Sequence, residues 1–129
     1  MNKLLLIILC TVLCGAVVQA APLSDTEKQF LARYEKVRAA LAADDLAAAK
    51  SAAGDLGEEG TTLAKSSSLK DARAAFEKLS DKAKQLAAGQ SGYYVVNCPM
   101  LRKDWVQTSE KIANPYFGKE MISCGEIKK

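Results

Sequence analysis

The sulfur-bearing side chains in the last third of the chain are the residues whose types could do chemistry. They form two short groups, Cys-Pro-Met at 98–100 and Met-Ile-Ser-Cys at 121–124. Thiolates and thioethers are soft donors, which suit Cu(I) and similar thiophilic ions. If the fold brings the two groups together, they offer a three- or four-coordinate site. The candidate metal ligands are Cys98, Met100, Met121 and Cys124.

The same two cysteines allow a plainer interpretation, a structural disulfide between Cys98 and Cys124. An even pair of cysteines in an oxidising compartment forms a disulfide by default. Closing this loop would add about 3–4 kcal/mol to the free energy of unfolding in the chain-entropy model. The methionines would then fill the core. The two interpretations can alternate as redox forms, because a disulfide removes both thiolates from the ligand set.

Composition excludes several other classes of protein. The chain of 129 residues has a formal net charge of +3 and no histidine. Without a basic tract a nucleic-acid binder is not expected. A structural zinc site would need four cysteine or histidine ligands, and a Cys98 nucleophile would lack its usual base. The chain also has no Cys-x-x-Cys redox motif, so we expect that it is not an enzyme.

Residues 1–20 have the features of a secretory signal peptide. Lys3 provides the positive start, residues 4–18 are apolar, and Val18 and Ala20 are the small residues before the cleavage site. An uncleaved membrane anchor is less favoured, because the apolar run is shorter than the ~20 residues that span a bilayer. We expect a mature chain of residues 21–129 in the periplasm, which touches the membrane only through the signal peptide before cleavage.

Cys10 and Cys14 would leave with the signal peptide. A lipoprotein is disfavoured, since the residue before each of these cysteines is leucine rather than a small residue. The mature chain therefore keeps only the two cysteines of the sulfur groups.

Residues 24–89 should position this chemistry as an antiparallel three-helix bundle, because apolar residues recur there at helical spacing. Ser24 and Glu27 are spaced as a capping box. The second helix should begin at Asp44-Asp45 and the third near Ser67 or Ser68. Three glycines, at 54, 57 and 60, disfavour the second helix. We expect it to end early or fray between residues 57 and 68. The charges on the outer faces, Arg73 among them, should form a solvated surface.

After a break at 89–92 the chain changes character. Residues 93–96 form a β-type run that predicts one short strand, and the Pro- and Gly-containing remainder to residue 129 should be irregular. Such a segment needs a disulfide, a metal or docking onto the helices. Trp105 is expected to anchor it to the helices, although it could also cover a Cu(I) site. Tyr116 and Phe117 should pack in the core, with Asn114-Pro115 setting a turn. The fold class is mainly α, in a single domain.

Several motifs together resemble the domain-of-unknown-function family 3347. They are Tyr-Val-Val-Asn-Cys-Pro-Met at 94–100, Asp-Trp at 104–105, Asn-Pro-Tyr-Phe-Gly at 114–118, Met121 and Cys-Gly at 124–125, with supporting matches at 40–49 and 73–80. Members of this family occur alone and attached to periplasmic adaptor subunits of copper and silver efflux pumps. The resemblance implies a periplasmic module that handles Cu(I) or Ag(I), with the efflux adaptor as its partner. Family members commonly carry a histidine where this chain has Asn97, which leaves an all-sulfur site or weaker binding.

Overall fold

The structure is a computed structural model that describes residue 15 and residues 19–129. The rest of the predicted signal peptide lies outside the described residues. In the part of the chain that is described, no helix is both long enough and apolar enough to cross a membrane.

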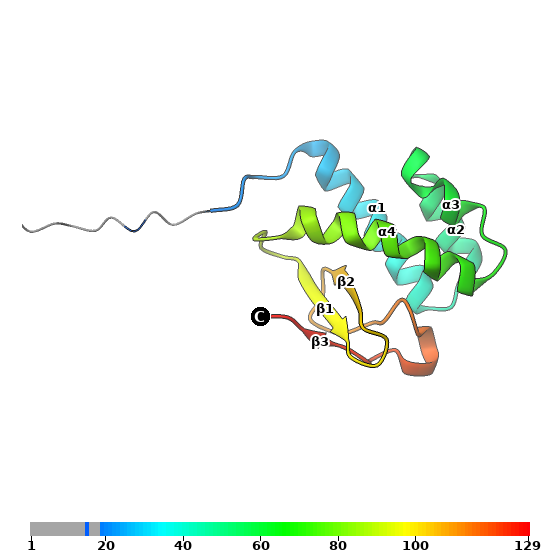
Figure 1. Cartoon of the computed structure of the whole chain (residues 1–129). Coiled ribbons are helices and arrows are strands. Elements are labelled where there is room, and N and C mark those ends of the chain that lie inside the picture. Colours follow the sequence, from blue (N-terminus) through cyan, green and yellow to red (C-terminus); the bar gives the residue numbers. More distant parts are fainter. Residues whose placement is uncertain (1–14, 16–18) are drawn as a thin grey trace, which may run out of the picture.

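The first part of the chain is helical, and the fold is mainly α. The helices are α1 (Asp25–Ala42), α2 (Leu46–Gly54), α3 (Thr61–Ala64) and α4 (Leu69–Ala87), with the 3-10 helix η1 (Gly57–Gly60) between α2 and α3. The two long helices, α1 and α4, pack on each other, and the shorter helices pack beside them (Figure 1).

Each of the three main helices begins at a side-chain cap. The capping box predicted at Ser24 and Glu27 is confirmed, with each side chain accepting a hydrogen bond from the other residue's backbone N–H. Asp45 caps α2 and Ser68 caps α4 by a single hydrogen bond each, the side chain accepting from the backbone N–H three residues on. Such caps satisfy N–H groups that the first turn of a helix leaves free.

The second helix ends early, as the glycines indicated, but already at Gly54. Of the two expected outcomes, an early end or fraying between residues 57 and 68, the structure shows the early end, and the chain continues as η1 and α3. Gly57 has a left-handed backbone with φ of 65°, which glycine adopts readily. At Gly60 a Cβ atom would collide with the backbone of Ala53. The glycines therefore shape a tight connection.

The last part of the chain forms a small sheet rather than the single strand that the sequence predicted. Its strands are β1 (Tyr94–Cys98), β2 (Lys103–Gln107) and β3 (Glu126–Ile127). They are antiparallel in the order β2-β1-β3, and the 3-10 helix η2 (Gly118–Met121) precedes β3. The sequence analysis missed β3 because two residues form a strand only by pairing with the distant β1.

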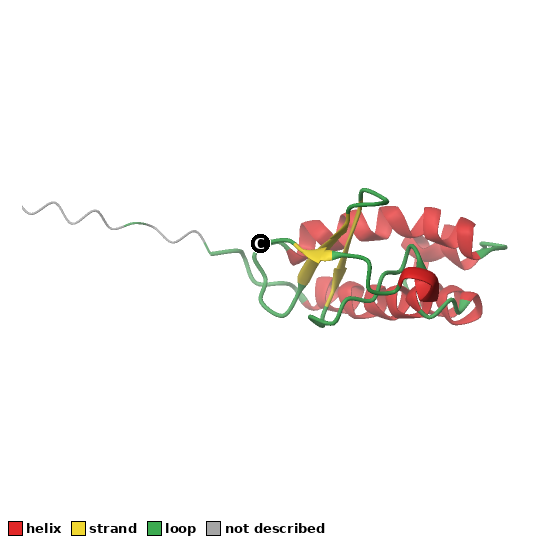
Figure 2. Ribbon diagram, turned by 90° about the horizontal axis from the view of Figure 1, so that it is seen from below, coloured by secondary structure: helices red, strands yellow, loops and turns green. Residues whose placement is uncertain are grey.

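The free edge of β2 is closed by hydroxyl groups from the helices. Tyr34 Oη on α1 accepts from Val106 N at 3.0 Å, and Ser80 Oγ on α4 donates to Asp104 O at 2.9 Å. Since the Ser80 proton is used, Tyr34 donates to Ser80 Oγ at 3.3 Å. Burying an edge strand requires such partners for its backbone groups. The sheet is thereby fixed to one side of the helices, and in the view from below it lies in front of them (Figure 2).

One hydrophobic core joins the helices and the sheet. A row of aromatic rings runs through it from α1 to β2 and comprises Phe30, Tyr34, Phe76, Tyr116 and Trp105. The rings of Tyr34 and Phe76 stack with centroids 5.1 Å apart, and Phe76 meets Tyr116 edge-on at 5.6 Å. The two chemically different halves therefore pack as one unit.

Candidate metal centre

The two cysteines of the sulfur groups lie side by side. Cys98 is the last residue of β1 and is fully buried, whereas Cys124 precedes β3 and is half-buried. Their Sγ atoms are 2.9 Å apart, and both are free thiols. The fold thus brings together one sulfur atom from each of the two groups.

Asn114 holds Cys124 in this position. The Asn114 side chain is completely buried, and its Nδ2 donates to the Cys124 carbonyl at 2.8 Å. Its Oδ1 accepts from the N–H groups of Tyr116 and Phe117, so the predicted turn at Asn114-Pro115 is present. The backbone N–H of Asn114 also donates to the Ile122 carbonyl at 2.7 Å. One side chain therefore ties the turn to the cysteine, a role that the sequence analysis did not assign.

Gly125 allows Cys124 to approach the sheet closely. A Cβ atom at Gly125 would lie 2.8 Å from side-chain atoms of both Val96 and Trp105. Val96 and Cys98 share a face of β1, because alternate residues of a strand point the same way. The absence of a side chain at Gly125 thus brings the segment that carries Cys124 against the face that carries Cys98.

Each methionine lies close to one of the two cysteines along the chain. Met100 lies in the turn between β1 and β2, and 66% of it is exposed. Met121 is half-buried at the end of η2, and its carbonyl accepts from the Cys124 N–H at 3.1 Å. Within residues 19–129, no group of three or more histidine, cysteine or acidic side chains is placed to hold a metal ion. A metal site here would rest on the two thiols and on whatever thioethers join them.

The environment of Cys124 favours its protonated form. The hydrogen bond with Cys98, together with burial, raises the pKa of the Cys124 thiol above its usual value. A thiophilic ion binds the thiolate, so binding must release protons. Metal affinity at this pair would therefore increase with pH.

Asn97 lies on the face of β1 opposite to Cys98, because neighbouring strand residues alternate. Its Nδ2 donates to Asp104 Oδ1 at 2.6 Å, and Lys128 Nζ lies 2.7 Å from Asp104 Oδ2. Desolvation opposes ionisation of Asp104, but the hydrogen bonds from Lys128 and Asn97 outweigh it and lower the pKa of this carboxyl. The position at which the resemblance expects histidine therefore belongs to a polar cluster away from the thiols.

Trp105 is a core residue, as expected. It is fully buried, and its Nε1 donates to Gln107 Oε1 at 2.9 Å. Gln107 is buried as well, and its Nε2 donates to the carbonyls of Ser109 and Lys111. The sequence analysis missed Gln107, since a single glutamine at the end of a short strand carries no local signal of burial. Tyr116 and Phe117 pack against the core, as predicted.

Arg73 corrects the expectation that the outer charges are solvated. Its side chain is only 18% exposed. Its Nε donates to Pro115 O at 2.8 Å, and its Nη2 donates to Leu41 O and to Asp44 Oδ1. On α1, Arg38 similarly donates to Ala113 O at 2.8 Å. Two arginines thus fix the loop that contains Asn114 to the helices.

The chain matches no family model, no curated protein and no solved structure. The likeness to family 3347 therefore rests on the quoted motifs alone, and the functional argument rests on the geometry of the site.

Proposed function

We propose that the chain is an exported module that binds Cu(I) or Ag(I) in association with heavy-metal efflux. The observation that carries the proposal is the meeting of Cys98 and Cys124, whose sulfur atoms come from distant segments and lie 2.9 Å apart. Thiolates are preferred ligands of Cu(I), and a modest separation of the two sulfurs would admit an ion between them. By resemblance, the partner is the periplasmic adaptor subunit of a metal efflux pump.

The methionines have different parts in this proposal. Met100 is well exposed two residues from Cys98, so its thioether is accessible to an arriving ion. Met121 is half-buried in the segment that leads to Cys124. Cys98, Met100, Met121 and Cys124 remain the proposed ligand set, with the two thiolates as its essential members. In this proposal α1, α2 and α4 act as an antiparallel three-helix bundle that supports the site.

A second candidate function is a disulfide-stapled structural or protein-interaction domain that docks on an efflux adaptor and binds no metal. The direct contact of the two thiols and the complete burial of Cys98 favour it. In an oxidising compartment such a pair would close the loop between residues 98 and 124. The bond would tie the end of β1 to the start of β3.

Two measurements on the exported protein separate the candidates. The first is a count of free thiols before any reductant is added, for which metal binding predicts two and the staple predicts none. The second is a titration of the reduced, anaerobic protein with Cu(I) in competition with a coloured chelator. We expect one equivalent of Cu(I) per chain, lost in both Cys98→Ser and Cys124→Ser. The matched control is Ser123→Ala, which removes an exposed hydroxyl next to Cys124 and should leave binding unchanged.

Methionine variants then define the ligand set. Met100→Leu and Met121→Leu keep the apolar volume and remove only the sulfur. Loss of affinity in either variant would make that thioether a ligand. Full affinity in both would restrict the site to the two thiolates. Reduced protein that binds no Cu(I) would overturn the metal proposal and leave the disulfide as the role of this cysteine pair.

A further inference from the structure

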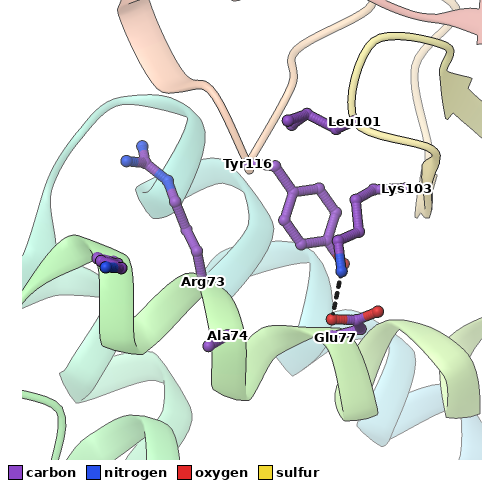
Figure 3. Close-up of a pocket in the computed structure, with 7 residues that line it drawn as sticks. Arg73, Ala74, Glu77, Leu101, Lys103 and Tyr116 are labelled. Atoms are coloured by element: carbon purple, nitrogen blue, oxygen red, sulfur yellow. Dashed lines mark hydrogen bonds and ion pairs between the residues drawn. The ribbon is translucent and has the colours of Figure 1, made fainter.

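A cavity lies between α4 and the β1–β2 hairpin, apart from the thiol pair. Its volume is about 530 Å³, which is within the range of small-molecule sites. Residues 70–77 of α4 form one wall, and Leu101, Lys103 and Tyr116 form the other. Figure 3 shows Lys103 reaching from the hairpin to Glu77 on α4, with the Tyr116 ring beside this pair. The cavity exists only because the sheet docks on the helix.

The walls carry more positive than negative charge. Lys70, Arg73, Lys103 and Glu77 line the cavity. Arg73 is paired with Asp44 and Lys103 with Glu77, so the charge left uncompensated is that of Lys70. Lys70 is exposed and has no ion-pair partner among residues 19–129. A cavity with an excess of cations favours an anionic ligand.

Two of the cations are held in place by the protein. The guanidinium group of Arg73 is anchored to two carbonyls and to Asp44. Lys103 Nζ lies 2.6 Å from Glu77 Oε2, so this ion pair joins the two walls. Fixed charges cost little side-chain entropy when a ligand binds. Because Asp44 and Glu77 compensate these two fixed cations, the net attraction for an anion comes from Lys70.

The remaining lining is apolar. The Tyr116 ring, Leu101 and Ala74 supply the apolar surface. Tyr116 Oη is buried and has no hydrogen-bond partner within the described part of the chain. Burial raises the pKa of Tyr116, so the hydroxyl stays protonated and able to donate. A buried polar group without a partner is costly, but this hydroxyl is buried away from the cavity surface, so the cavity meets the Tyr116 ring rather than its Oη.

We propose that this cavity binds a small organic anion, a carboxylate or sulfonate carried on an aromatic or aliphatic body. The anionic group would meet Lys70 and Lys103 at the rim, and the apolar body would lie against Tyr116 and Leu101. The proposal is independent of metal binding, because none of the cavity residues is a candidate metal ligand.

The test uses two fluorescent probes that differ in charge, added to the folded full chain. Anilinonaphthalene sulfonate is an aromatic anion, and phenylnaphthylamine is its neutral counterpart. We expect saturable binding of one sulfonate probe per chain, about twofold to fivefold tighter than the neutral probe, as one partly exposed charge contact provides. Octanoate should displace the sulfonate probe, whereas octylamine should not.

Variants locate the binding. Lys70→Gln should weaken binding of the sulfonate probe about twofold to fivefold and leave the neutral probe unchanged. The matched control is Lys36→Gln, which removes an exposed lysine of α1 outside the cavity. Ala74→Phe fills the cavity from an exposed helix position and should abolish binding of both probes.

Three results would overturn the proposal. They are equal affinity for the two probes, an equal effect of Lys70→Gln and Lys36→Gln, and binding that survives Ala74→Phe. A Cys98→Ser variant should bind the sulfonate probe normally, so the outcome is separate from that of the Cu(I) titration. Circular dichroism would verify that each variant keeps its helices.

Discussion

The helical part, residues 24–89, and the motif segment, residues 93–129, are stabilised in different ways. In the helical part, apolar side chains at helical spacing bury one face of each helix, and local caps satisfy the ends. In the motif segment, buried Gln107 and Asn114 each bond several backbone groups.

This difference follows from the amount of regular structure. A helix satisfies its own backbone N–H and C=O groups, but an irregular segment must find other partners for them. The motif segment uses buried amides for this purpose, and the helices contribute Arg38 and Arg73. Single polar substitutions should therefore damage the motif segment as severely as apolar truncations damage the helices.

The largest loss of stability is expected for Asn114→Ala. It would remove the bonds to Cys124 O and to two backbone N–H groups, leaving buried polar groups unpaired, at a cost of about 3–5 kcal/mol. Chemical denaturation measures this loss. Leu41→Ala on α1 is the apolar comparison, with an expected loss of about 2–5 kcal/mol.

Ser109→Ala is the matched polar control. The Ser109 hydroxyl accepts one exposed hydrogen bond, from the Lys111 N–H, so its loss should cost less than about 0.5 kcal/mol. If Asn114→Ala were as mild as Ser109→Ala, the contrast between the two parts of the chain would fail.

A smaller loss of stability is expected for Arg73→Lys, which tests the contacts that join the helical part to the motif segment. Lysine cannot reproduce the fork that contacts Pro115 O, Leu41 O and Asp44, and the expected loss is about 2–3 kcal/mol. The control is Arg33→Lys, at an exposed position of α1. Equal stability of the two variants would show that the helices do not fix the loop through this guanidinium.

Tyr34→Phe should lower the free energy of unfolding by about 1–2 kcal/mol. The change keeps the ring in the aromatic row but leaves the Val106 N–H without its acceptor. Tyr94→Phe is the control, because its hydroxyl bonds only to the exposed Glu110. Hydrogen exchange at Val106 would show the effect directly, and unchanged protection there would refute the closure of the β2 edge by Tyr34.

The smallest expected effect is on the way the stability of the fold depends on pH. The hydrogen bond from Arg73, with a second from the Lys119 N–H, lowers the pKa of Asp44 below its usual value. A lowered pKa stabilises the fold above the unfolded value, and that stability is lost as the pH falls through the folded pKa. Between pH 6 and about 2, the parent should lose more stability than Asp44→Asn.

The control for the pH series is Asp55→Asn, an exposed carboxylate without an ion pair in the described residues. This variant should follow the same pH course as the parent. If the stability of Asp44→Asn also followed the same pH course as that of the parent, the Asp44 carboxylate would not be one of the groups that stabilise the loop.

Sequence analysis located the helix starts well because caps act within one turn. Ser24, Asp45 and Ser68 are each recognisable from a few neighbouring residues. The change of character at residues 89–92 is equally local, since it follows from glycines and composition. By contrast, β3, Gln107 and the buried contacts of Arg73 depend on residues far along the chain. No local pattern distinguishes a buried arginine from a solvated one.

The candidate site divides in the same way. The types of Cys98, Met100, Met121 and Cys124, and hence the soft-donor chemistry, are properties of the sequence alone. Only the tertiary structure decided that the two thiols meet while Met100 stays exposed, and that Asn97 faces away from them. The physical reason is that strand pairing alternates side chains between two faces, and that Asn114 and Gly125 bring a distant segment onto one of them.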